Sequence, residues 1–112
     1  MKITQKQVGN VTVLGVDGKI TIGAGDLALR QAVQQALEGG TGNLVINLSR
    51  VTQIDSSGVG ELVSAYTTAM NRGCKLRLAC IPQKVNDVLT ITQLITVFDV
   101  YDTEDEAVRS FQ

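Results

Sequence analysis

The chain has 112 residues, of which 44% are hydrophobic and 19% are charged, and its 10 basic and 11 acidic residues leave a formal net charge of -1. This length fits a single domain, 1-112, that is large enough to enclose one hydrophobic core. The charge balance argues against a non-specific nucleic-acid binder, which needs a surplus or a cluster of basic residues. An aromatic content of 4% also argues against a base-stacking platform.

Apolar runs in the chain fall short of the roughly 18 residues that a bilayer-spanning helix needs. The first residues do not form a signal peptide, so we expect a cytoplasmic protein without membrane insertion. Cys74 and Cys80 would lie roughly 20 Å apart in an extended segment, at about 3.3 Å per residue. We therefore expect them to be reduced core residues, because a disulfide needs a much shorter separation.

The beginning of the chain predicts a β-hairpin. Strands are expected over 3–8 and 11–17, with Gly9-Asn10 as a two-residue turn between them. Asp17-Gly18 is expected to end the second strand in a turn, and residues 19–25 to form a glycine-containing connector. The connector lacks the full pattern of a phosphate-binding loop.

Helices and strands then alternate. A helix is predicted over 26–38, a buried parallel strand over 43–48 and a second helix over about 57–72. The apolar residues expected on the inner side of that second helix are Val59, Leu62, Val63, Tyr66 and Met70. The last expected elements are a strand over 74–80, a helix opened by Pro82, a strand over 97–100 and a helix opened by a Thr103/Glu106 capping box.

This order of elements predicts an α/β fold. We expect a mostly parallel sheet of about five strands with an antiparallel N-terminal edge hairpin, and about four helices. The crossover connections are expected to be right-handed.

The stretch Ile54-Asp55-Ser56-Ser57-Gly58-Val59-Gly60 joins the central strand to the second helix. The free N–H groups at the start of a helix, together with its macrodipole, favour an anion such as phosphate. Ser56 is therefore a candidate phosphoacceptor. The competing interpretation is that Ser56 and Ser57 are simply N-cap residues.

The sequence lacks the residues that a catalytic role for this stretch would require. Histidine is absent, and no G-x-S-x-G elbow surrounds the serines, so a hydrolase is disfavoured. Asp55 follows a parallel strand as a phospho-aspartate would, but Asp26 alone in the first strand-to-helix connector makes a poor Mg²⁺ site. We expect a protein that is not an enzyme and that has no metal and no cofactor.

Phosphorylation of Ser56 would act through charge. A phosphoserine adds about -1.5 to -2 charge units at neutral pH, here beside Asp55 and near Glu61. A partner fitted to the neutral loop would have to desolvate this charge, which costs several kcal/mol when it is unpaired. Modification would then abolish binding and leave the fold nearly unchanged.

The segments Val45-Ile46-Asn47-Leu48-Ser49 and 54–60 together resemble the signature of the STAS-domain anti-sigma factor antagonists. The turn at Gly18 and its following helix, the strand at 75–80, Pro82 and the segment 97–101 extend the resemblance over essentially the whole chain. It implies that the unphosphorylated protein binds an anti-sigma factor that is also a serine kinase, and so frees a sigma factor. It also implies that the kinase phosphorylates Ser56 and that a metal-dependent serine phosphatase reverses this.

The resemblance also implies roles for the neighbouring residues. Asp55 and Ser57 would shape the acceptor loop, and Gly58 would allow close approach of the partner. The partner-binding residues we expect are Thr21, Ile22, Gly23 and Val59. Val59 fits a contact residue or a core residue equally well, and Thr21 stands where family members often carry an acidic residue. The alternative function is a docking subunit of a signalling or lipid-transport complex that does not switch.

Overall fold

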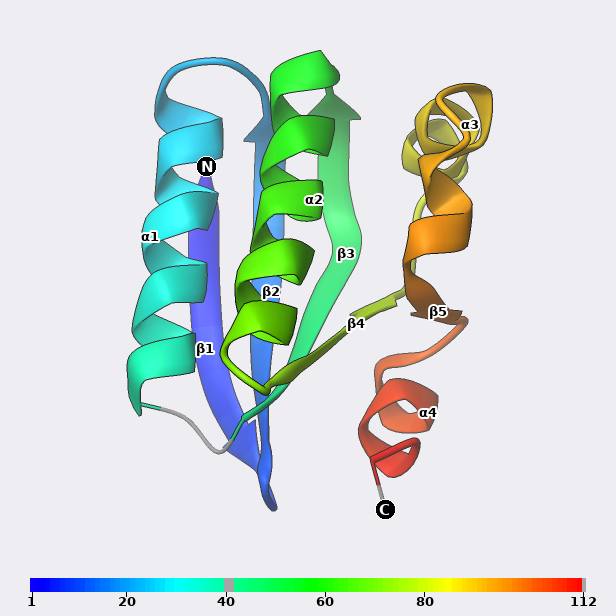
Figure 1. Cartoon of the computed structure of the whole chain (residues 1–112). Coiled ribbons are helices and arrows are strands. Elements are labelled where there is room, and N and C mark those ends of the chain that lie inside the picture. The colour runs from blue at the N-terminus through cyan, green and yellow to red at the C-terminus, as the bar shows by residue number, and fades with distance from the viewer. Residues whose placement is uncertain (40–41, 112) are drawn as a thin grey trace.

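The computed structural model describes residues 1–39 and 42–111, which form a five-stranded sheet flanked by helices (Figure 1). The strands, in the order in which they lie in the sheet, are β1 (Lys2–Val8), β2 (Val11–Ile20), β3 (Asn43–Ile54), β4 (Lys75–Ala79) and β5 (Asp99–Tyr101). The helices are α1 (Ala24–Gly39), α2 (Ser56–Asn71), α3 (Gln83–Ile91) and α4 (Glu104–Arg109), with a 3-10 helix η1 at Leu94–Val97.

The pairing of the strands confirms the predicted mixed sheet. β1 and β2 are antiparallel and joined by the Gly9-Asn10 turn, where Gly9 has a φ of 60°. The pairs β2–β3, β3–β4 and β4–β5 are all parallel. Parallel neighbours need a crossover, and α1, α2 and α3 supply the three crossovers.

The expected turn at Asp17-Gly18 is wrong. β2 continues through both residues to Ile20, and its pairing with β3 shifts register between Gly15 and Asp17 and again between Gly18 and Lys19. Gly18 has a φ of 116°, which glycine adopts readily and which suits an irregularity inside a strand. The β2–β3 ladder therefore extends to Ile20 and Ile54, directly before Asp55 and Ser56.

The two faces of the sheet carry different layers. α1 and α2 lie side by side over β1, β2 and β3 (Figure 1), and with α3 they enclose the main hydrophobic core. Alternate strand residues point to the opposite face, where α4 covers a smaller cluster. That cluster comprises Val11, Val13, Val45, Ala79, Ala107 and Val108.

Polar contacts fix the start of α4 against the sheet. The Glu104 carboxylate lies 2.7 Å from the Lys6 Nζ and accepts a 3.0 Å hydrogen bond from the Asn47 Nδ2. Partial burial alone would raise the pKa of Glu104, but the bonds from Lys6 and Asn47 bring it below its usual value. The Thr103 hydroxyl caps this helix by accepting from the Glu106 N–H at 3.1 Å, as the capping box predicts.

Other predicted details need small corrections. Met70 is 53% exposed, and Ala69, fully buried, takes the inner position expected for it. Pro82 is the N-cap residue of α3, one position before the helix begins. Cys74 and Cys80 are free thiols, as expected, but both are only partly buried.

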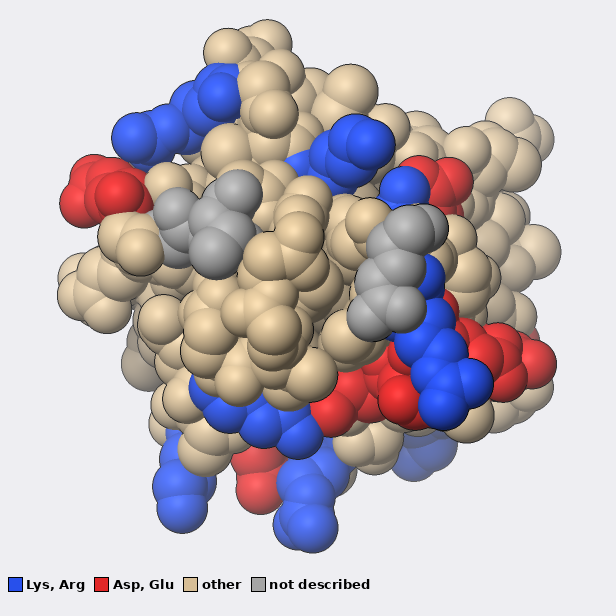
Figure 2. All heavy atoms as spheres, turned by 90° about the horizontal axis from the view of Figure 1, so that it is seen from below, with Lys and Arg blue, Asp and Glu red and all other residues tan. Residues whose placement is uncertain are grey.

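The surface seen from below carries both basic and acidic side chains. This view looks at the end of the molecule that holds the β1–β2 turn, and basic and acidic side chains intermingle over it (Figure 2). In the described ranges, none of the helices combines the length and the apolar character that crossing a membrane requires.

The burial pattern of α2 predicts two opposite responses to truncation. Leu62→Ala removes a fully buried side chain and is expected to lower the free energy of unfolding by about 2–5 kcal/mol. Met70→Ala, at a position that is 53% exposed, is expected to change it by less than about 0.5 kcal/mol. Urea denaturation measures both, and equal losses would contradict the assigned face of α2.

Candidate functional site

The candidate site lies at the carboxyl ends of β2 and β3. Ile20 and Ile54 are direct partners in the parallel ladder, so the residues that follow each of them leave the sheet side by side. The loop of residues 21–23 follows β2, and Asp55 and Ser56 follow β3. Topology thus brings together two segments that are more than 30 residues apart in the sequence, with a pair separation of 33 for Ile22 and Asp55.

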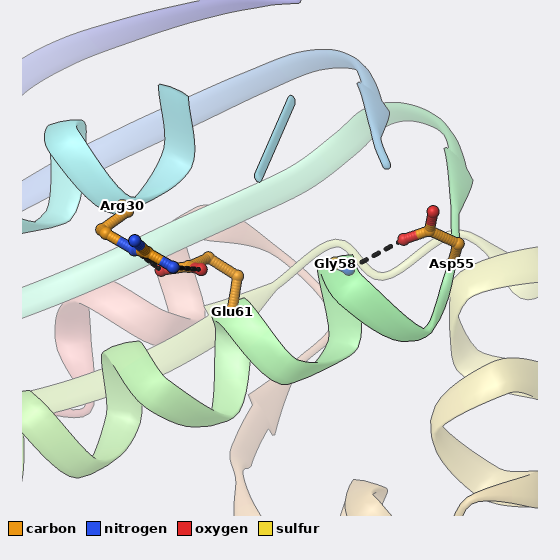
Figure 3. Close-up of polar contacts among 4 residues, drawn as sticks. All are labelled: Arg30, Asp55, Gly58 and Glu61. Carbon is orange, nitrogen blue, oxygen red and sulfur yellow. Dashed lines mark hydrogen bonds and ion pairs between the residues drawn. The ribbon is translucent and has the colours of Figure 1, made fainter. Parts of the chain in front are cut away.

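Asp55 joins these two segments through its carboxylate. It is the N-cap residue of α2, in an extended conformation, and its Oδ1 accepts a 2.9 Å hydrogen bond from the Gly58 N–H (Figure 3). Its Oδ2 accepts a 3.0 Å hydrogen bond from the Ile22 N–H. The Ile22 and Gly58 N–H groups stabilise the charged form and hold the pKa of Asp55 below its usual value.

Capping by Asp55 tests the interpretation of the two serines as N-cap residues. α2 begins at Ser56, so Ser56 and Ser57 are its first two residues and neither is the N-cap. The interpretation of the serines as caps is therefore wrong. Ser56 is exposed and Ser57 is half-buried.

Gly58 permits a close approach, but within the chain itself. A Cβ on Gly58 would lie 2.1 Å from the Ile20 carbonyl oxygen, and one on Gly25 would lie 2.3 Å from the Lys19 carbonyl oxygen. The first turns of α2 and α1 thus lie directly against two consecutive backbone carbonyls at the end of β2. The expected role of Gly58 in admitting a partner is corrected accordingly, because Gly58 is buried against β2.

The expected partner-binding residues differ in exposure. Ile22 is 75% exposed, Gly23 is exposed and Thr21 is half-buried. Val59 is only 3% exposed and packs in the main core. The prediction of Val59 as a contact residue is therefore wrong, because its helical position turns it toward the sheet.

Sequence reasoning missed an ion pair between α1 and α2. The Arg30 Nε donates to the Glu61 Oε1 at 3.1 Å and its Nη2 donates to the Oε2 at 3.0 Å (Figure 3). Glu61 is only 6% exposed, and its hydrogen bond and charge raise the pKa of Arg30. The available signal was an acidic residue directly before Leu62, on the inward side of the helix. Because the charge of Glu61 is paired, the expected repulsion between it and a phosphate on Ser56 is much reduced.

A separate hollow lies away from the candidate site. Its volume is about 320 Å³, it lies on the face of the sheet that α4 partly covers, and it shares no residue with the acceptor loop. Its charged lining residues are Lys2, Lys6, Asp17, Arg50 and Glu104. Across residues 1–39 and 42–111, no group of three histidine, cysteine, aspartate or glutamate side chains is arranged to hold a metal ion.

The fold and the site define a class of small α/β domains that present a helix-initiating serine at the carboxyl end of a mixed sheet. The family model of the STAS domain matches residues 2–107. The chain therefore belongs to the STAS domain family, as the resemblance in the sequence implies.

Similar proteins match the chain over most of their length. A Thermotoga neapolitana protein, provisionally named an anti-sigma factor antagonist homolog, is 28% identical over 107 residues, which cover 96% of this chain and 95% of the relative. The crystal structure of a Thermotoga maritima protein with a similar provisional name has 27% identity and a TM-score of 0.87, covering 96% of this chain and 92% of that one. The phosphorylated form of the Bacillus protein SpoIIAA has 18% identity and a TM-score of 0.76, covering 99% and 100%, and shows the same fold.

Two glycines in α2 give a matched pair for testing the contact with β2. Gly58→Ala places a Cβ against the Ile20 carbonyl and is expected to destabilise the protein by about 2 kcal/mol or more. Gly60→Ala meets nothing within 4 Å and is expected to stabilise it by about 0.5–1 kcal/mol. Denaturant unfolding of both variants checks this, and a neutral Gly58→Ala would argue against the close approach.

The lowered pKa of Asp55 predicts an acid-sensitive contribution to stability. Because the folded-state pKa lies below the unfolded one, the stabilisation is present above the unfolded value, about 3.9, and is lost as pH falls through the folded value. Asp55→Asn should therefore be less stable than the wild type at pH 7, and the difference should shrink near pH 3. Urea midpoints at the two pH values measure this, and a difference independent of pH would contradict it.

Proposed function

We propose that this protein is an anti-sigma factor antagonist whose unphosphorylated form binds an anti-sigma factor that is also a serine kinase, and thereby frees a sigma factor. The observation that carries the proposal is the exposed Ser56 at the first position of α2, beside a carboxylate that already caps the helix. Its hydroxyl is accessible to a kinase and is not needed for capping. The names of the relatives support the same function.

The proposed docking surface comprises Thr21, Ile22, Gly23 and Ser56. Ile22, 75% exposed, supplies an apolar anchor for a pocket on the partner. Burying such a side chain stabilises a complex by about 1.5–3 kcal/mol before the costs of association. Asp55 holds the Ile22 backbone 3.0 Å from its carboxylate, so the anchor and the acceptor serine keep a fixed relation.

Phosphorylation turns this surface off. The Ser56 Oγ attacks the γ-phosphorus of ATP bound to the kinase, a new O–P bond forms, ADP leaves and the hydroxyl proton is released. The phosphoserine carries about -1.5 to -2 charge units, and the partner would have to desolvate this charge to stay bound. The helix N-terminus tolerates the phosphate, so the fold persists while binding is lost. A metal-dependent serine phosphatase restores the hydroxyl by hydrolysis.

In this proposal the chain itself is not an enzyme and acts in the cytoplasm. The kinase and the phosphatase supply the chemistry, and this protein supplies the acceptor hydroxyl and a surface. Its sequence contains no histidine to serve as a general base for Ser56.

Substitution of the two serines tests the acceptor. A serine kinase encoded next to this gene, supplied with ATP, should add one phosphate to the wild type and to Ser57→Ala but none to Ser56→Ala. Ser56→Asp should weaken binding to that kinase by about 1–2 kcal/mol or more and shift stability by less than about 0.5 kcal/mol. Mass spectrometry, calorimetric titration and denaturation measure the three quantities.

Two outcomes would contradict the switch. One is phosphorylation at a residue other than Ser56. The other is partner binding of both Ser56→Ala and Ser56→Asp with the wild-type affinity, which would instead indicate a docking subunit of a signalling or lipid-transport complex that does not switch.

A further inference from the structure

We propose that the Asp55 carboxylate transmits the phosphorylation state of Ser56 to the loop of residues 21–23, so that modification changes the shape of the docking surface as well as its charge. The inference rests on the proposed function, because it assumes that Ser56 is the acceptor. It adds a mechanical link between the acceptor and the apolar anchor Ile22.

The link consists of two hydrogen bonds that the Asp55 carboxylate accepts from two different segments of the chain. The Oδ1 is bound to the Gly58 N–H at 2.9 Å and the Oδ2 to the Ile22 N–H at 3.0 Å. The first bond belongs to the start of α2 and the second to the loop before α1. A rotation of the Asp55 side chain cannot change one bond without disturbing the other, because both oxygens belong to one rigid group.

The loop has little else to hold its middle residue in place. Ile22 is 75% exposed, so packing does not fix it, and Gly23 next to it has a φ of 102°. The other backbone bonds of the loop run toward α1: the Asp26 N–H donates to the Thr21 carbonyl at 3.1 Å and the Leu27 N–H to the Gly23 carbonyl at 3.4 Å. The position of the Ile22 backbone relative to α2 therefore depends on Asp55.

A phosphate on Ser56 disturbs this arrangement in two ways. It follows Asp55 directly in the chain, and Asp55, with its lowered pKa, is ionised at neutral pH, so the two anions repel each other. The phosphate oxygens also compete for the N–H groups of Ser57 and Gly58 at the helix start, which is the preferred seat of such an anion. Displaced from Gly58, the carboxylate releases the Ile22 N–H, and the loop moves.

Amide hydrogen exchange of the Ile22 N–H tests the link without any kinase or partner. The intact ¹⁵N-labelled chain is prepared with phosphoserine incorporated at position 56, and NMR follows the exchange of Ile22, of Gly58 and of the buried Leu62, which reports global opening. We expect exchange of the Ile22 amide to be faster than in the unmodified protein by about tenfold or more, with Leu62 unchanged. Asp55→Asn, unmodified, should accelerate Ile22 in the same direction.

The matched control is phosphoserine at position 64, an exposed residue of the same helix farther from the loop. It adds the same charge to α2 and should leave Ile22 exchange unchanged. If phosphoserine at position 56 perturbs Gly58 but leaves Ile22 exchange as it was, or if position 64 has an equal effect, the proposed link is wrong. The proposed function would survive either result, because kinase acceptance of Ser56 and loss of partner binding are measured separately.

Discussion

The site depends on the close packing of two helix starts against the last residues of β2. Carbonyl oxygens of Lys19 and Ile20 lie where a Cβ on Gly25 or Gly58 would be, at 2.3 and 2.1 Å. Neither contact leaves room for a side chain, so backbone atoms set how closely α1 and α2 approach the carboxyl end of β2. Backbone contacts of this kind are stiff, since an atom fixed in a strand cannot turn away as the end of a side chain can. The loop of residues 21–23 and the beginning of α2 inherit their positions from that packing.

Electrostatic interactions then refine what the packing has fixed. Asp55 uses its two oxygens for two N–H groups from different segments, and Arg30 of α1 pairs with the buried carboxylate of Glu61 in α2. An unpaired buried carboxylate would be strongly destabilising, whereas a paired one on this interface fixes the relative position of α1 and α2. A phosphate on Ser56, as the proposed function requires, would add about -1.5 to -2 charge units beside Asp55, which exceeds the formal net charge of -1 of the whole chain.

Local sequence patterns were sufficient for most elements and insufficient where two elements meet. Residues a few positions apart determine the apolar face of α1, the apolar run of β3 and the Thr103 cap, so the sequence pattern alone predicts them. Asp17-Gly18 is a typical turn sequence, but Gly18 lies inside β2, because its pairing with β3 outweighs the local preference for a turn. Val59 could face outward or inward on helical spacing alone, and the sheet beneath α2 buries it. The partner of Glu61 is 31 residues away, beyond the reach of any local pattern.

The sequence by itself determined the α/β class, the order of strands and helices, the family resemblance and the location of Ser56 at a helix start. These properties are carried by hydrophobic period, by helix and turn signals and by a contiguous motif, all of which are local. The tertiary structure alone decided that Asp55 rather than a serine caps α2, that Gly58 is buried against β2, and that Ile22 lies beside Asp55. Those facts depend on which strands are neighbours and how closely helices approach them, and long-range packing of the whole chain sets both.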